Sequence, residues 1–311
     1  MPATTPGVDR SRRQVAIGLC LAAASPSLLA EPAPAELGVD LVKTGLYLIR
    51  GGGCNSLLRL SAVGSVLVDG KLPGTYRPLM SQIRRINKLS DLPLRVVILT
   101  NHHEIHAGNH GPFIDAGMAV LAQVNALPRL PAAPTPSASA SAVAGRRKAG
   151  AVLGVERRHD FGIGGVDVQL HHFGPAQTDD DLVVLFPDLR VVAVGELYAT
   201  TPPMPDFKNG GSLSGWGPAL EQLLELDFDI AVPSAGLPVG RAELAVFQRR
   251  VETLTSRAAA LVRAGVAQDR FLQQLVTADL GWTMPLDAED IRHLYADLAR
   301  GSETARSERA K

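Results

Sequence analysis

Short apolar runs separated by turn-forming residues dominate the first part of the chain. These runs occupy residues 39–42, 46–49, 55–60 and 65–68. The segments between them include Lys43-Thr44-Gly45 and Gly51-Gly52-Gly53, which have the composition of tight turns. The pattern predicts a β-meander over residues 37–69.

Helical spacing of apolar residues begins after the meander. Leu79, Ile83 and Ile86 predict a helix within 73–89, and the apolar run at 94–99 predicts a buried strand. The same criteria predict further strands at 119–123, 166–173, 182–186, 190–194 and 228–232, and helices at 113–117, from 212, and at 242–264, 271–277 and 288–298. Strands followed by helices, in two rounds, predict a mixed α/β fold of four layers, an αββα sandwich. The tight turns between the early strands argue against a doubly wound sheet.

The first 35 residues resemble a cleavable secretory signal. Arg12-Arg13 precedes the apolar run 15–24, and small residues follow at Ala33-Pro34-Ala35. The paired arginines resemble a twin-arginine signal, which predicts a periplasmic or secreted protein. Cys20 lies within the apolar run, so that cleavage would leave Cys54 as the one thiol. We therefore expect no disulfide and no integral membrane segment in the mature chain.

The rest of the chain is expected to form one domain over residues 36–300. Residues 130–150 are rich in Pro, Ala and Ser and show no apolar periodicity, which predicts a flexible excursion from that domain. Residues 301–311 are predicted to form a charged tail.

Composition excludes some classes of partner. Lys plus Arg and Asp plus Glu both number 31, and aromatic residues make up 5% of the chain. A formal charge of zero and few aromatic residues argue against nucleic-acid binding. A small-molecule substrate or ligand is the expected partner, while its identity and the oligomeric state stay open.

The candidate chemistry lies in the loop after the strand at 94–99. His102, His103 and His106 fall within five positions, followed by Ala107-Gly108-Asn109. Clustered imidazoles in a glycine-containing loop at a sheet edge are a common arrangement of metal ligands.

Together with this loop, several other motifs make the chain similar to the metallo-β-lactamase-fold hydrolases over about residues 39–298. The motifs are Val68-Asp69, residues 173–178, Phe186-Pro187-Asp188 through Gly195-Glu196, Gly210-Gly211-Ser212 through Trp216, and residues 226–229 before Pro233. The resemblance implies an αββα fold, hydrolysis of esters, amides or thioesters, and a zinc site.

The ligand set that this resemblance implies is incomplete here. The family's His-x-His-x-Asp-His loop corresponds to Asn101, His103, Ile105 and His106, so that its first histidine and its aspartate are lost. The next ligand histidine is replaced by Gln177, the bridging aspartate by Glu196 and the last histidine by Ala235. Amides are poor zinc ligands, and Ile and Ala cannot coordinate a metal. The sequence therefore argues against a dinuclear zinc centre.

Three hypotheses follow for the loop. In the first, His103, His106 and Glu196 hold zinc or another single divalent ion, with Gln177 as a weak fourth ligand, His102 as a further candidate and Asp69 supporting the loop. In the second, the protein is a catalytically inactive pseudoenzyme that binds a small molecule or a partner in the same cleft. In the third, the histidines are polar loop residues satisfied by hydrogen bonds.

Overall fold

The structure is a computed structural model that describes residues 37–87, 92–131 and 151–309. The expected signal at 1–35 and nearly all of the expected excursion at 130–150 lie outside the described residues. The strands, helices and contacts are those of the described residues.

The first sheet contains seven strands in chain order. They are β1 (Gly38–Lys43), β2 (Leu46–Arg50), β3 (Ser56–Ser61), β4 (Gly64–Val68), β5 (Leu94–Ile98), β6 (Ala119–Gln123) and β7 (Val152–Val155). Strands β1 to β4 pair antiparallel, as the predicted meander requires, whereas β4 to β7 pair parallel.

The second sheet contains six strands in the order β13-β12-β11-β10-β9-β8. They are β8 (Arg158–Ile163), β9 (Val166–His171), β10 (Val183–Phe186), β11 (Val191–Gly195), β12 (Ile230–Pro233) and β13 (Val239–Gly240). Within this second sheet of the described residues, only β11 and β12 pair parallel.

Strands β7 and β8 were not predicted from the sequence. Both lie at the edge of a sheet, and most of their residues are exposed or half-buried. An edge strand with little buried surface needs no apolar pattern, so its sequence carries little signal.

The helices are α1 (Tyr76–Asn87), α2 (Glu104–Ala107), α3 (His110–Asp115), α5 (Leu213–Glu225), α6 (Arg241–Arg263), α7 (Phe271–Gln274) and α8 (Ala288–Arg309). Short 3-10 turns occupy Val124–Ala126, Phe207–Asn209, Gln268–Arg270 and Ala278–Leu280. Helix α8 runs into the segment 301–311, for which a tail was expected. Among the described helices, none combines the length and apolar character needed to cross a membrane.

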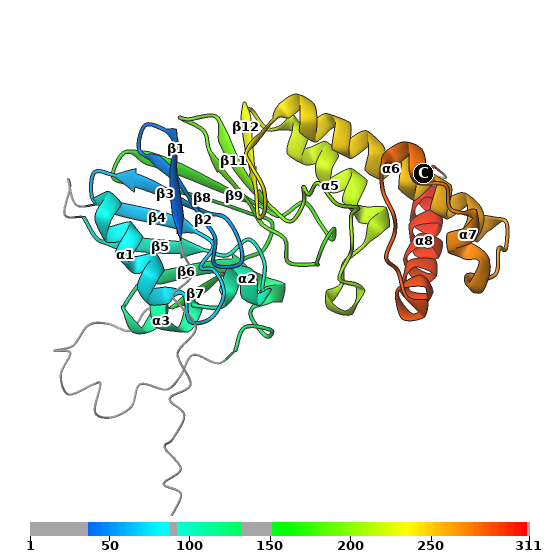
Figure 1. The fold of residues 1–311 in the computed structure, drawn as a ribbon, viewed down its shortest axis with the longest axis horizontal. Coiled ribbons are helices and arrows are strands. Elements are labelled where there is room, and N and C mark those ends of the chain that lie inside the picture. The colour runs from blue at the N-terminus through cyan, green and yellow to red at the C-terminus, as the bar shows by residue number, and fades with distance from the viewer. Residues whose placement is uncertain (1–36, 88–91, 132–150, 310–311) are drawn as a thin grey trace, which may run out of the picture. The chain divides into compact units, whose positions relative to one another are not determined.

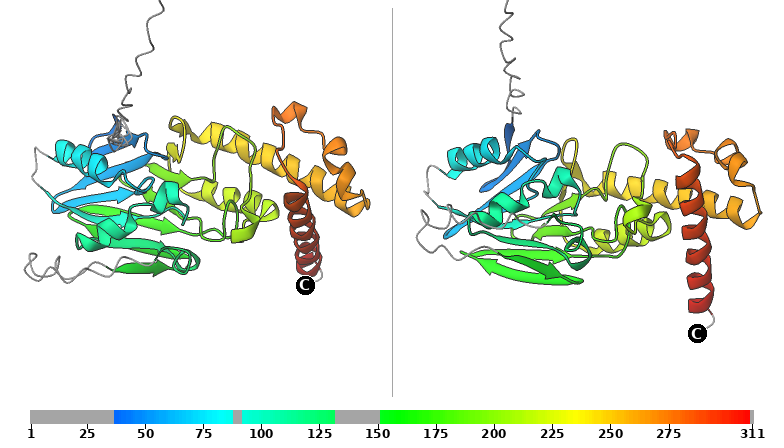
Figure 2. Two further views of the ribbon diagram at one scale, coloured as in Figure 1. Left: turned by 60° about the horizontal axis from the view of Figure 1, so that its bottom comes forward. Right: turned by 90° about the horizontal axis from the view of Figure 1, so that it is seen from below.

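Three apolar cores separate the layers, which confirms the predicted αββα sandwich. One core lies between the two sheets and includes Leu57, Ile98 and Phe186. A second joins the first sheet to α1 and α3, and a third joins the second sheet to α5 and α6, against which α8 packs (Figures 1 and 2). Each sheet therefore buries one face against its partner sheet and the other against helices.

A buried lysine organises the loop between β2 and β3. The Lys71 side chain is fully buried, and its Nζ donates to the carbonyl oxygens of Ile49, Gly51 and Cys54 at 2.8, 2.7 and 2.6 Å. An ammonium has three donors, and here all three are used. Burial lowers the pKa of Lys71 to about 8, and the nearby Cys54 and Asp69 oppose this shift.

Replacing this lysine is expected to destabilise the fold. Lys71→Met would keep the apolar stem and remove the ammonium donor from three carbonyl oxygens. The bonds to Ile49 and Cys54 are buried, and each buried group left without its donor costs about 1–3 kcal/mol. We expect a loss of at least about 2 kcal/mol in the free energy of unfolding, measured by denaturant titration. Lys43→Met, at an exposed position, is the control. Equal stability of the two variants would contradict the role given to Lys71.

Candidate metal centre

The histidine loop and its partners meet where neighbouring strands end. Val68 pairs with Ile98 across parallel strands β4 and β5, so that Asp69 follows β4 beside the start of the loop. Glu196 directly follows β11 in the other sheet. Gly195 has a left-handed φ of 54°, and a Cβ at this position would lie 3.0 Å from the Thr100 side chain. Glycine at 195 therefore lets the two sheets approach closely here.

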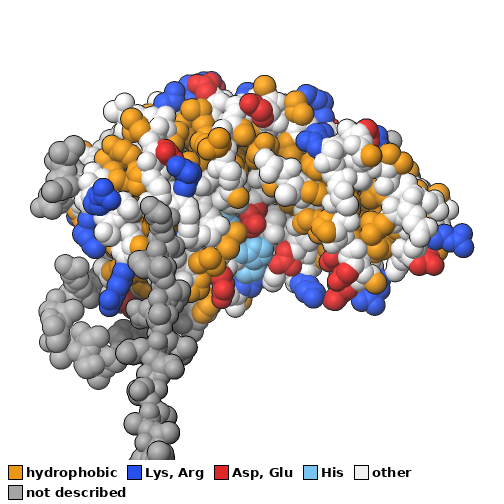
Figure 3. Space-filling model, in the orientation of Figure 1, with side chains coloured by type: hydrophobic (Ala, Val, Ile, Leu, Met, Phe, Trp, Pro, Cys, Tyr) orange, Lys and Arg blue, Asp and Glu red, His pale blue; other side chains and the backbone are white. Residues whose placement is uncertain are grey.

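One carboxylate oxygen joins three side chains of the loop. Glu196 Oε2 accepts a hydrogen bond from Asn101 Nδ2 at 2.8 Å and lies 3.0 Å from His103 Nδ1. The same oxygen lies 3.4 Å from His106 Nε2. Burial alone would raise the pKa of Glu196, but the hydrogen bonds of His103 and Asn101 and the nearby charge of His106 hold it far below its usual range. Histidine and acidic side chains are visible side by side on the molecular surface (Figure 3).

His106 is fully buried, and its two ring nitrogens differ in their surroundings. Nδ1 lies 2.9 Å from Asp69 Oδ2 and 3.1 Å from Thr100 Oγ1, whereas Nε2 has no hydrogen-bond partner among the described residues. Burial opposes protonation of the ring, but Asp69 raises the pKa of His106 well above its ordinary value. Asp69 thus fixes the orientation of the ring and leaves Nε2 aimed at Glu196.

His103 is also flanked by two carboxylates. Its Nε2 lies 3.0 Å from Asp206 Oδ2, which also accepts a hydrogen bond from Asn209 Nδ2 at 2.7 Å. Hydrogen bonding to Glu196 raises the pKa of His103, burial opposes this, and Asp206 raises the pKa further. Sequence reasoning missed Asp206, because it belongs to no motif and lies at the start of the short turn Phe207–Asn209.

The donor set of this cluster fits a divalent cation. The buried lone pair of a neutral His106 Nε2 would face the Glu196 carboxylate with nothing positive between them. A second proton on the ring would resolve this conflict, and so would a metal ion. Two imidazolium groups, or one divalent cation with two neutral imidazoles, give the same net charge to the cluster of Asp69, Glu196, Asp206, His103 and His106. With a metal, each imidazole would still donate its other N–H to a carboxylate, which is the usual support of a metal-ligating histidine.

The two amide side chains at expected ligand positions lie beside this cluster. Asn101 Oδ1 accepts a hydrogen bond from the His103 backbone N–H at 3.0 Å, and Asn101 Nδ2 lies 3.5 Å from Gln177 Oε1. Asn101 therefore presents its donor side to Glu196, not an oxygen. Gln177 contacts Asn101, and no hydrogen bond joins it to either histidine among the described residues.

The remaining candidates face elsewhere. His102 Nδ1 lies 2.7 Å from Asp180 Oδ2, although a ring nitrogen of His102 also lies within 4.8 Å of candidate ligand atoms on His103 and Asp206. Ala235 is exposed and Ile105 is half-buried, and neither has an atom that can bind a metal.

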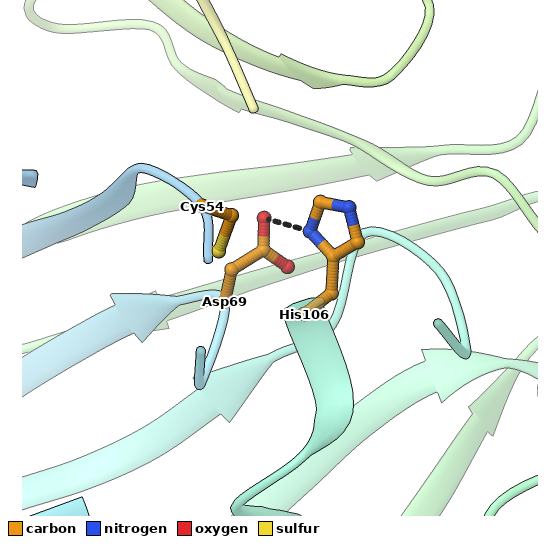
Figure 4. Close-up of side chains that lie close together, drawn as sticks. All are labelled: Cys54, Asp69 and His106. Atoms are coloured by element: carbon orange, nitrogen blue, oxygen red, sulfur yellow. Dashed lines mark ion pairs between the residues drawn. The ribbon is translucent and has the colours of Figure 1, made fainter. Parts of the chain in front are cut away.

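A second group of potential ligands includes His106 and lies on its Asp69 side. Cys54, Asp69 and His106 are buried and offer ligand atoms within 4.8 Å of one another (Figure 4). The Asp69 oxygens, however, already accept hydrogen bonds from the Thr100 backbone N–H at 2.8 Å and from Thr100 Oγ1 at 3.0 and 2.9 Å. Asp69 is therefore better suited to orienting His106 than to holding an ion.

The model of the metallo-beta-lactamase superfamily matches residues 49–235, more than half of the chain. A search of curated proteins found no match.

Solved structures share the fold at low sequence identity. A metallo-beta-lactamase from Pontibacter korlensis has a TM-score of 0.55 and 19% identity, covering 70% of this chain and 99% of its own. The mono-zinc form of the metallo-beta-lactamase FIM-1 from Pseudomonas aeruginosa has a TM-score of 0.54 and 17% identity, covering 71% and 97%. The sec-alkylsulfatase Pisa1 from Pseudomonas sp. has a TM-score of 0.63 and 15% identity, covering 83% of this chain and 50% of its own. At such identities the likeness shows the fold alone.

Removing the charge of Asp206 is expected to lower the pKa of His103. The raised pKa means that protonated His103 stabilises the fold below the ~6.5 pKa of a free imidazole, and that this contribution is lost as the pH rises through the folded-state value. Asp206→Asn should therefore destabilise the metal-free protein more at about pH 5.5 than at about pH 8.5, and NMR titration should show the lowered pKa. Asp167→Asn, at an exposed residue, is the control. An unchanged His103 pKa in Asp206→Asn would refute the contact.

Proposed function

Since the chain belongs to the metallo-beta-lactamase superfamily, we propose that it is a hydrolase with one divalent metal ion, held by His103, His106 and Glu196. The superfamily assignment and the hydrolase-like fold are established above. The ion, its ligands and the activity are the proposal.

One observation carries the proposal. His106 Nε2 is a fully buried ring nitrogen with no hydrogen-bond partner among the described residues, and it points to a carboxylate oxygen 3.4 Å away. Two nitrogens and one carboxylate are a sufficient protein ligand set for a single divalent ion with open positions. The loss of ligands at Ile105 and Ala235 argues for one ion instead of two, and FIM-1, which shares the fold, is known in a mono-zinc form.

The protein side chains have distinct roles in such a site. A divalent ion bound there would polarise a substrate carbonyl and acidify a water molecule. Asp69 and Asp206 hold the two imidazoles in the tautomers that leave His106 Nε2 and His103 Nδ1 free toward Glu196. Asn101 fixes the Glu196 carboxylate through its amide donor. The expected substrates are esters, amides or thioesters.

We expect the protein, purified without nickel affinity chromatography, to bind about one equivalent of divalent metal. The double variant His103→Ala, His106→Ala should lose the metal, and its hydrolysis of a panel of esters, thioesters and a β-lactam should fall by ~100-fold or more. Metal content by mass spectrometry and initial rates of hydrolysis measure both effects. His159→Ala, at an exposed histidine, should behave as the wild type.

Protons compete for the same nitrogens, which gives a further check on this experiment. Because the pKa values of His103 and His106 are raised, metal binding must release protons, and the apparent affinity should increase with pH. Less than about a tenth of an equivalent of metal at alkaline pH would refute the proposal.

The second candidate function is a catalytically inactive binding protein. It is favoured by the amide donor that Asn101 presents to Glu196, since this donor partly neutralises the carboxylate without a metal. In that case both imidazoles would be protonated, and the wild type and the double variant would show equal, negligible hydrolysis.

We also propose that the protein is exported to the periplasm or secreted. Arg12-Arg13 and the apolar run after them support this localisation. Replacing both arginines by lysine is expected to leave the protein in the cytoplasmic fraction of a bacterial host with a twin-arginine pathway, as measured by immunoblotting of cell fractions. Export of this variant at the wild-type level would refute the twin-arginine signal.

A further inference from the structure

A groove with a volume of about 340 Å³ runs beside the histidine cluster. The loop between β2 and β3 forms one wall, and the loop after β12 forms the other. This volume is at the lower end of the ~300–1,000 Å³ range of small-molecule sites. The groove is lined by Arg50, Gly51, Gly53, Cys54, Asn55, Ser234, Ala235, Gly236 and Leu237.

Hydrogen bonds hold the two walls together. Asn55 Nδ2 donates to the carbonyl oxygens of Pro233 and Gly236, both at 2.9 Å, and the Asn55 backbone N–H donates to Ser234 O at 2.7 Å. Lys71 stabilises the first wall through hydrogen bonds from its Nζ to the carbonyl oxygens of Gly51 and Cys54. The groove is therefore preformed.

Several polar groups of the walls are already engaged in hydrogen bonds. The same hydrogen bonds use the Asn55 amide donor and the carbonyl oxygens of four lining residues, which are Gly51, Cys54, Ser234 and Gly236. Arg50 alone among the lining residues is charged, and its guanidinium is paired with Asp40. These groups are consequently not free to bind a ligand.

The surface of the groove is more apolar than polar. Leu237 is 72% exposed at the rim. A side chain at Gly53 would lie 2.6 Å from Leu72 Cγ and 3.5 Å from Ile105 Cβ, which shows that both apolar side chains border this wall. Ile105 and Ala235 occupy positions at which the family resemblance implies ligands of a second metal. Ala235 lines the groove, and Ile105 lies next to Gly53 of its first wall.

The groove adjoins the candidate metal centre on both walls. Cys54 lies beside Asp69 and His106, with candidate ligand atoms within 4.8 Å of one another. On the other wall, the Ser234 backbone N–H donates to the Gly195 carbonyl oxygen at 2.8 Å, directly before Glu196. A substrate group bound in the groove would therefore lie next to a hydrolysable bond held at the histidine cluster.

We propose that this groove binds an uncharged acyl or alkyl group of the substrate. The space of a second metal site has become the apolar subsite of a one-metal hydrolase. The inference rests on the proposed function for its role in catalysis, whereas the apolar binding itself does not.

A chain-length series of p-nitrophenyl esters tests the catalytic role. In the wild type, kcat/KM should increase from acetate to longer unbranched acyl groups by about two- to fourfold per methylene until the groove is filled. Leu237→Ala should flatten this dependence. Val276→Ala is the matched control. Val276 is an apolar residue that is 60% exposed and does not line the groove, so this variant should keep the dependence on chain length.

Calorimetric binding of unbranched primary alcohols, from ethanol to octanol, tests the groove without any hydrolysis. Affinity should increase with chain length in the wild type and in Val276→Ala, and the increase should be smaller in Leu237→Ala. If no ester is hydrolysed but alcohol affinity follows this pattern, the proposed function fails and the apolar site stands. If the alcohols bind without dependence on length or on Leu237, the apolar site is refuted whether or not esters are hydrolysed.

Discussion

The negative charge of Glu196 is the constraint on which the candidate site depends. This mostly buried carboxylate follows a strand of the second sheet, and every close partner of its Oε2 comes from the histidine loop of the first sheet. A buried carboxylate is stable only when donors or cations compensate it. Asn101, His103 and His106 supply that compensation. The interactions of Glu196 therefore connect the second sheet to the histidine loop of the first sheet, at the edge where the chemistry is expected.

This requirement also explains why the imidazoles have supporting carboxylates. A histidine that faces Glu196 with a lone pair needs its other nitrogen to carry the proton, and Asp69 and Asp206 favour that arrangement. The support is unequal. Asp69 is nearly fully buried and fixed by Thr100, whereas Asp206 is on an irregular segment between β11 and α5. His106 is therefore the more rigid of the two potential ligands.

The sequence predicts the fold well where apolar residues are periodic. The meander, the buried strand before the histidine loop and the helices of the second half follow from spacing alone, and the superfamily resemblance is confirmed by the match over residues 49–235. Strands β7 and β8 escaped prediction because an exposed edge needs no apolar pattern. In the site, His103, His106 and Glu196 were named from motifs and are close together in the structure. Asp206 and Cys54 were not, because contacts between distant loops leave no local signature in a single sequence.

The three hydrogen bonds of Asn55 have a consequence for selectivity. They join a hairpin of one sheet to a loop of the other, so that the width of the groove is set before any ligand arrives. A binding site of fixed width loses little conformational entropy when it is filled, and it cannot widen to admit a bulkier guest. Selection among ligands in such a protein would depend on the width of the ligand more than on its polar groups. The hydrogen bonds of Asn55 would set the width that is accepted.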